Sequence, residues 1–197
     1  MLCTLSTAAA AGEGYARLEG HGGPIKGLAV SPDGRHALSA SFDTSLGLWS
    51  LPEGTHLRWL EGHEAGANAA RFLGNGRALS VGDDFDLLLW EVESGRLLRR
   101  FEGHRGKVMG LAVSPDGDQV ATAGWDGVIG LWTLADGDVR WLEGHTANVN
   151  DVVFSSDGSL LYSASYDGTI RRWALEDPAP LPVTLKKHGF GVNHLVL

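Results

Sequence analysis

A Gly-His pair returns at a nearly fixed interval along this chain of 197 residues. The histidines are His21, His63, His104 and His145, at steps of 42, 41 and 41 residues, and His188 follows 43 residues later. A fixed period of roughly 20 to 50 residues is the signature of a repeat architecture, in which each repeat is one supersecondary unit. The period therefore restricts the chain to folds built from four like units followed by a partial fifth.

Each repeat reads as a series of short strands joined by turns. Alternating apolar segments at residues 25–30, 108–113 and 149–154 are each followed by a polar corner with Asp-Gly, and then by a second apolar segment. This pattern indicates a β-hairpin, because Gly, Asn and Asp tolerate the positive φ of tight turns. A second and a third turn lead to a last short strand such as 97–101. The sequence thus predicts four strands in each repeat.

Four further positions recur together in every repeat: a His after Gly, a Ser or Thr four residues before a turn Asp, that Asp, and a Trp six residues beyond it. In chain order they are His21, Ser39, Asp43, Trp49; His63, Ser80, Asp84, Trp90; His104, Thr122, Asp126, Trp132; and His145, Ser163, Asp167, Trp173. With these positions, residues 15–197 resemble the WD-repeat (WD40) β-propeller family. The resemblance implies a buried tetrad in which Asp and Ser or Thr oxygens accept the His and Trp N–H groups, as buried polar groups must satisfy one another.

The resemblance implies an all-β fold of WD40 blades within one repeat domain at residues 15–197. We expect repeats at about 20–61, 62–102, 103–143 and 144–187, a truncated fifth repeat at 188–197, and an orphan N-terminal strand at 15–18. Residues 1–14 are expected to be a leader-like or disordered N-terminus. Four repeats do not reach the usual seven blades of the family. A fragment of a longer protein, a homodimer that completes a ring and an open arc with exposed strand edges therefore all stay open, and exposed edges favour association.

Composition excludes several partners and leaves the compartment undecided. The net charge is −8 and no run of Lys or Arg exceeds a pair, which argues against nucleic acid as a partner. The single cysteine, Cys3, excludes an internal disulfide framework, and no segment has the ~20 apolar residues of a membrane span. Ala9, Ala10 and Ala11 are typical of a signal-peptidase site, but no basic residue precedes them. Periplasmic or exported and cytoplasmic locations both remain open.

The repeated Ser or Thr, His and Asp could be mistaken for a catalytic triad. An active site occurs once and breaks a repeat pattern, whereas this trio occurs four times in one register with a Trp as its fourth member. The Gly-His sites are also spread one per repeat, instead of converging as metal ligands must. We therefore predict a protein that is not an enzyme and that needs no metal and no cofactor.

Partners of WD-repeat proteins commonly contact three positions per blade: three and five residues after the His, and the residue before the turn Asp. Carried over to this chain, the candidate partner-binding residues are Lys26, Phe42, Asn68, Asp83, Lys107, Met109, Trp125, Asn148, Asn150 and Tyr166. Three of the four residues before the turn Asp are aromatic, and exposed aromatic side chains are typical of binding hot spots. Packing of these rings on neighbouring loops is the structural alternative.

These features predict a non-enzymatic scaffold that binds a protein or peptide on the top face of the propeller. A second hypothesis comes from residues 15–43, which look like WD40 domains of exported bacterial proteins that carry a c-type cytochrome segment. On that hypothesis the chain is an accessory domain of an exported redox protein. The chain itself has no Cys-x-x-Cys-His sequence for haem attachment.

Overall fold

A computed structural model of the chain describes residues 18–51, 53–74 and 76–196. The leader-like residues 1–14, most of the orphan strand at 15–18, and Asn75 of the second hairpin corner lie outside the described residues. Leu18 and the two residues after it belong to no strand. Within the described ranges no helix is long and apolar enough to cross a membrane.

In these described ranges sixteen strands form four antiparallel sheets of four strands each, and every sheet falls within one repeat of the sequence. Blade 1 contains β1 (Ile25–Val30), β2 (His36–Ser41), β3 (Ser45–Ser50) and β4 (Thr55–Glu61). Blade 2 contains β5 (Ala67–Leu73), β6 (Arg77–Gly82), β7 (Leu87–Glu91) and β8 (Arg96–Phe101). Blade 3 contains β9 (Val108–Val113), β10 (Gln119–Gly124), β11 (Ile129–Thr133) and β12 (Val139–Leu142). Blade 4 contains β13 (Val149–Phe154), β14 (Leu160–Ser165), β15 (Thr169–Ala174) and β16 (Val183–Lys187).

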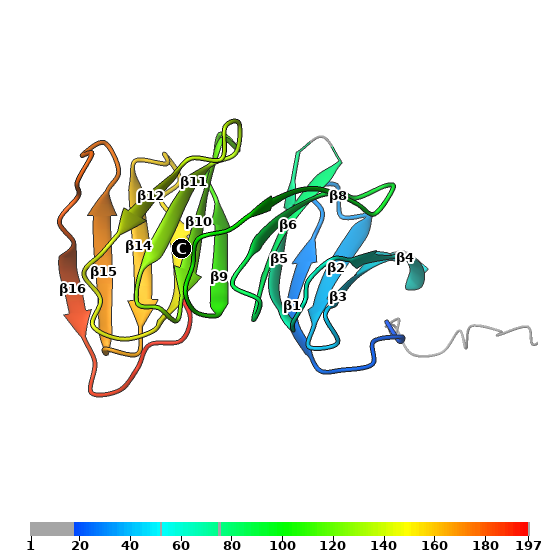
Figure 1. The fold of residues 1–197 in the computed structure, drawn as a ribbon, viewed down its shortest axis with the longest axis horizontal. Helices are drawn as coiled ribbons and strands as arrows, with labels where there is room; N and C mark the ends of the chain where they lie inside the picture. The colour runs from blue at the N-terminus through cyan, green and yellow to red at the C-terminus, as the bar shows by residue number, and fades with distance from the viewer. Residues whose placement is uncertain (1–17, 52, 75, 197) are drawn as a thin grey trace, which may run out of the picture.

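The blades follow one another in chain order, as the ribbon in Figure 1 shows, with blade 1 at one end and β16 at the other. Within each blade the strands pair in sequence order, so the first strand of the repeat is one edge of its sheet. These first strands contact each other from blade to blade, β1 with β5, β5 with β9 and β9 with β13. They form the inner wall of the arc, as the inner strands of a propeller do. The predicted all-β fold of four-stranded blades is confirmed.

Turns explain why the hairpins close where they do. Gly34, Gly117 and Gly158 at the first corners have φ of 70°, 80° and 75°, in the left-handed region that glycine adopts without a steric cost. At the second turn the residue after the Asp also has a positive φ. It is glycine in blades 3 and 4, but Thr44 and Phe85 in blades 1 and 2, with φ of 77° and 75°. A side chain at such a φ is strained, so these two turns store local strain.

The core lies between blades, where the apolar face of one sheet packs on the next sheet. We call the face toward the following blade the forward face and the opposite one the rear face. Five forward-face positions recur by strand register: Leu38, Ala40, Leu46, Leu48, Leu60 in blade 1; Leu79, Val81, Leu87, Leu89, Phe101 in blade 2; and Ala121, Ala123, Ile129, Leu131, Leu142 in blade 3. Each set joins a buried cluster with rear-face residues of the next blade, so the three junctions are alike.

The segment after β16 takes the place of a further inner strand without being a strand. Asn150 Nδ2 donates to the Val192 carbonyl at 2.9 Å, just as Asn68 Nδ2 donates to the carbonyl of Val108 in the next blade at 3.0 Å. Val108 and Val192 both stand four residues after a histidine of the repeat series, His104 and His188. Residues 188–196 nevertheless form no strand.

Candidate functional site

The tetrad of blade 3 is a chain of buried hydrogen bonds. Trp132 Nε1 donates to Thr122 Oγ1 at 2.8 Å, and that hydroxyl lies 2.7 Å from His104 Nε2. His104 Nδ1 lies 2.8 Å from Asp126 Oδ2, which also accepts the amide of Arg105 at 2.8 Å. These hydrogen bonds thereby link the loop before the blade to the blade's second and third strands and to the turn between those strands.

The same three bonds occur in the other blades at nearly identical lengths. In blades 1, 2 and 4 the Trp-to-hydroxyl distances are 2.7, 2.8 and 2.8 Å. The matching His Nε2-to-hydroxyl distances are 2.6, 2.7 and 2.7 Å, and the His Nδ1-to-carboxylate distances are 2.9, 2.8 and 2.7 Å. The hydroxyl-bearing residues are at most 1% exposed. A substrate has no access to them, which fits a structural role.

The ionisation of the tetrad side chains decides which atom donates and which accepts in each of these hydrogen bonds. Burial raises the pKa of Asp126, but hydrogen bonds from His104 and the Arg105 amide outweigh it and hold the pKa below its usual range. The carboxylate therefore accepts, and the imidazole Nδ1 donates. In blade 4 burial lowers the pKa of His145, which Asp167 only partly offsets, so this imidazole is neutral at neutral pH. Its Nε2 then accepts the hydroxyl proton of Ser163, whose oxygen accepts Trp173 N–H.

A concavity of about 670 Å³ opens on the inner strands, where the partner-binding residues were expected. Six of the ten line it: Lys26, Asn68, Met109, Trp125, Asn150 and Tyr166. Phe42, Asp83, Lys107 and Asn148 do not line it. Two of these four, Asp83 and Lys107, are bound to residues that do.

Polar contacts link this rim from blade to blade. Asp83 Oδ1 accepts Asn68 Nδ2 at 2.8 Å, and Asp83 Oδ2 accepts Lys107 Nζ of the next blade at 2.5 Å. The Lys107 ammonium also lies 5.7 Å from the centre of the Trp125 ring. Trp125 Nε1 donates to Asn150 Oδ1 of blade 4 at 3.2 Å. Side chains that the resemblance marks for partners thus already hold neighbouring blades together.

The three aromatic side chains before the turn Asp are both packed and exposed. Phe42 and Tyr166 lie against Gly66 and Gly191, where a Cβ atom would stand 2.9 and 2.8 Å from the nearest ring carbon. Each of these glycines is three residues after the histidine of the following repeat. Phe42, Trp125 and Tyr166 still expose 52%, 37% and 57% of their surface. Packing on neighbouring loops therefore coexists with exposure that a partner could cover.

Sequence reasoning missed several residues of the concavity. Arg71 of β5 lines it with one guanidinium bond to the Ala70 carbonyl, at 2.8 Å. Asp151 also lines it and holds the C-terminal segment, since its Oδ2 accepts the amide of Leu195 at 2.9 Å and lies 2.6 Å from His194 Nδ1. Aligning the repeats could have found Asp151, because the other repeats have only Gly or Ala at its position.

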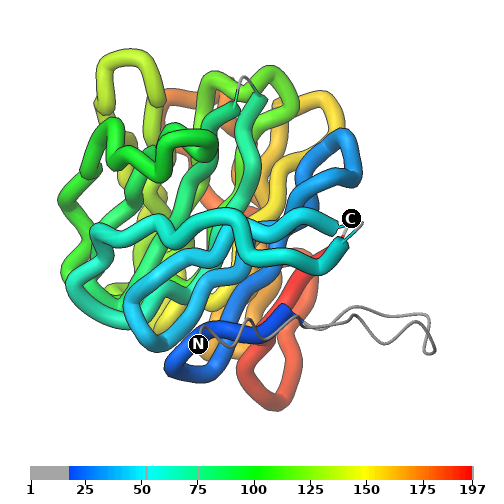
Figure 2. The backbone as a smooth tube through the Cα atoms, turned by 90° about the vertical axis from the view of Figure 1, so that its right-hand side faces the viewer, coloured from blue at the N-terminus to red at the C-terminus, as the bar shows by residue number. Residues whose placement is uncertain are grey.

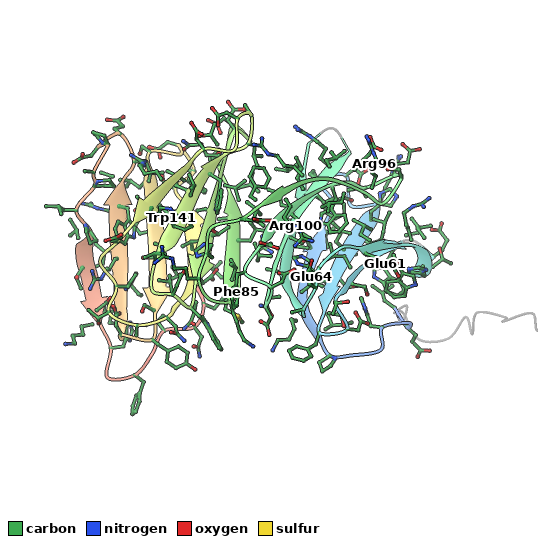
Figure 3. The ribbon with its side chains drawn as sticks, viewed as in Figure 1. Glu61, Glu64, Phe85, Arg96, Arg100 and Trp141 are labelled. Carbon is green, nitrogen blue, oxygen red and sulfur yellow. The ribbon has the colours of Figure 1, made fainter. Side chains whose placement is uncertain are left out.

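A second charged group lies outside the concavity, between the turns of blade 2. Arg100 Nη1 donates to Asp86, and its Nη2 lies 3.8 Å from Glu64; Figure 3 shows Arg100 beside Glu64. Burial raises the pKa of Asp86 in spite of this bond. Across the described ranges no group of three His, Cys, Asp or Glu side chains is placed to hold a metal ion.

The family model for the WD domain, G-beta repeat, matches residues 12–50, 95–133 and 138–174. These segments make up more than half of the chain, so the protein belongs to the WD40 repeat family. The match skips most of blade 2, although that blade has its tetrad. The match covers repeats alone and gives no support to the likeness to cytochrome-associated domains. The chain matches no curated protein.

Membership of this family makes the chain a domain of the protein-interaction scaffold kind. WD40 domains generally bind proteins or peptides, and they typically act as non-catalytic scaffolds. The repeated four-stranded blades supply the frame of that domain.

Proposed function

We propose that the chain is a non-catalytic scaffold that binds a protein or peptide segment over the concavity of the inner strands. The observation that carries the proposal is the exposure of Trp125 and Tyr166 at the mouth of that concavity. Aromatic side chains give much contact area for little conformational entropy, which is why they dominate binding hot spots. The polar contacts between blades hold the rim in place before any partner arrives, which lowers the entropic cost of binding.

The charges of the concavity favour an acidic segment. Lys26 and Arg71 both line it, and neither has an acidic partner among the residues that the structure describes. The one carboxylate of the lining, Asp151, is occupied by the Leu195 amide and His194. The concavity therefore presents cationic groups although the whole chain has a net charge of −8. A peptide with Asp or Glu beside an apolar residue matches both the cations and the rings.

Selection of a peptide-display library against the purified chain tests this function. We expect enrichment of acidic peptides, and fluorescence anisotropy of an enriched peptide should show binding at least about tenfold weaker to Trp125→Ala and to Lys26→Ala. Leu98→Ala is the matched control, because Leu98 and Trp125 both expose 37% of their surface and Leu98 lies on β8. Enrichment of basic peptides, or unchanged binding by Trp125→Ala, would contradict the proposal.

The role of accessory domain in an exported redox protein rests on the resemblance alone and stays a prediction. So do the repeat boundaries, the leader-like N-terminus and a homodimer that completes a ring.

A further inference from the structure

A second chamber, of about 350 Å³, adjoins the concavity along the inner strands of blades 3 and 4. The two spaces share four lining residues, which we call the constriction: Arg71, Leu111, Asp151 and His194. The C-terminal segment that supplies His194 is red in Figure 2, on the side of the molecule where β1, in blue, also lies. The concavity and the second chamber are therefore neighbouring spaces that meet at the constriction.

The second chamber carries no charge beyond the constriction. Its other lining residues are uncharged and mostly apolar: Ala112, Val113, Pro115, Val152, Val153, Phe154, Ser155, Ser156 and Leu195. An aliphatic side chain that enters the chamber exchanges water for an apolar surrounding, which is favourable. The chamber thus fits an aliphatic group, whereas the concavity presents cations and aromatic rings.

Arg71 departs from the pattern of the inner wall. By strand register it stands where blades 1, 3 and 4 have Ala29, Ala112 and Val153. Arg71 is half-buried, and its one hydrogen bond from the guanidinium within the described structure is the Nη1 bond to the Ala70 carbonyl. A guanidinium has five N–H donors, so most of the donors of Arg71 are left for a ligand.

Asp151 does not supply the counter-charge for Arg71. Its Oδ2 accepts the amide of Leu195 at 2.9 Å and lies 2.6 Å from His194 Nδ1, while its Oδ1 accepts the amide of Val152 at 2.9 Å. Both carboxylate oxygens are thus engaged by other groups. A half-buried cation without a counter-charge is unfavourable, and such departures from the folding rules occur at functional sites. We therefore expect Arg71 to meet an anion of the ligand.

We propose that the bound acidic segment passes the constriction, with an Asp or Glu side chain paired to Arg71 and an aliphatic side chain two residues away in the second chamber. This inference rests on the proposed function and adds to it the register of the bound segment. A guanidinium and a carboxylate form two parallel hydrogen bonds, which fixes the position of the acidic residue. In an extended peptide, side chains two residues apart point the same way and lie roughly 7 Å apart.

Fluorescence anisotropy with a peptide enriched in the display selection tests this register. The peptide is amidated at its C-terminus, so that every carboxylate belongs to a side chain. We expect binding at least about tenfold weaker for Arg71→Gln, and equally for a peptide whose acidic residue is replaced by the matching amide. Combining the two changes should add little further loss, because both remove the same ion pair. Arg77→Gln is the matched control, at a half-buried arginine of β6 that lines neither space.

Val153→Phe tests the second chamber separately, because the larger side chain fills space that the aliphatic group needs. Val153 is half-buried and lines the chamber on β13. The parent peptide should bind this variant at least about fivefold more weakly, whereas a peptide with alanine at the aliphatic position should bind the variant and the parent chain equally. Calorimetry verifies that each variant folds, and the arginine variants keep the proposal testable if Val153→Phe does not.

The outcomes separate this inference from the proposed function. Binding that depends on Trp125 but is unchanged by Arg71→Gln, or by loss of the acidic residue from the peptide, would overturn the inference and leave the proposed function standing. Unchanged binding by a folded Val153→Phe would overturn the inference as well. A selection that yields no binding peptide would overturn both.

Discussion

Replacing Asp126 by alanine tests the tetrad of blade 3 directly. The carboxylate accepts His104 Nδ1 and the Arg105 amide, both at 2.8 Å, and the His104 side chain is only 1% exposed. Without the carboxylate the imidazole N–H has no partner inside the blade, while water can reach the amide of Arg105. Thr122 and Trp132 keep their own bond but lose the anchored imidazole that orients it.

The loss can be sized from these contacts. A buried donor left without a partner costs about 1 to 3 kcal/mol, and disturbance of the linked Thr122 bond adds to it. We therefore expect Asp126→Ala to lower the free energy of unfolding by about 2 to 4 kcal/mol. For a chain of this size each kcal/mol shifts the melting temperature by about 2–4 °C, so the expected drop is about 4 to 16 °C.

Differential scanning calorimetry at neutral pH measures this drop. Asp118→Ala is the matched control: it removes the same charge from an exposed residue of the neighbouring hairpin corner whose carboxylate makes no hydrogen bond in the described structure. The control should stay within about 0.5 kcal/mol of the parent chain. An unchanged melting temperature for Asp126→Ala, or a drop no larger than that of the control, would refute the reasoning.

Three further predictions use the same calorimetric or urea-unfolding measurements. Thr44→Gly should raise the free energy of unfolding by about 1 kcal/mol, because Thr44 has a φ of 77°, which is unfavourable for a residue with a side chain. A lower free energy of unfolding would contradict the inference that this turn is strained. Gly130→Ala should cost about 1 to 3 kcal/mol, because the new Cβ would stand 2.6 Å from the tetrad indole nitrogen, whereas Gly74→Ala, with open space around it, should be nearly neutral. Acidification should destabilise the chain in two stages. His145 stays neutral in the fold because burial lowers its pKa, whereas the unfolded chain takes up a proton at this histidine below about pH 6.5. The pKa values of the tetrad carboxylates are lowered in the fold, so their contribution to the free energy of unfolding is lost below about pH 4. Asp86, with a raised pKa, offsets part of this second stage, and stability that rises between pH 8 and pH 5 would contradict the assignment.

Much of the blade could be predicted because its strands alternate and its turns have a fixed chemistry. The apolar segments 25–30, 108–113 and 149–154 are the strands β1, β9 and β13, with the same bounds. Period and alternation depend only on neighbouring residues, so they can be read from one sequence. The spacing of His, Ser or Thr, Asp and Trp likewise lies within a single repeat, and the structure brings these four side chains together in each blade.

The rest depends on which residues of different repeats meet. Arg71 and Asp151 line the concavity only because β5 and β13 lie on the inner wall of the arc. The inner strands also carry register shifts, such as the one between Val149 and Asp151, which change the face that a side chain presents. The positive φ of Phe85 was missed for another reason: the turn imposes that conformation, and no local preference of phenylalanine signals it.

The tetrads and the blade junctions also differ in how a new repeat could be added to the gene. All four residues of a tetrad, such as His104 to Trp132, lie in one stretch of about a repeat length. Tandem duplication of that stretch copies donors and acceptors together, so the new blade inherits its internal bonds complete. A junction needs two faces from two repeats, as where Leu79 and Leu89 of blade 2 pack with Leu111 and Trp132 of blade 3. A duplicated repeat therefore brings a complete tetrad, but its two faces still have to match the neighbours on either side.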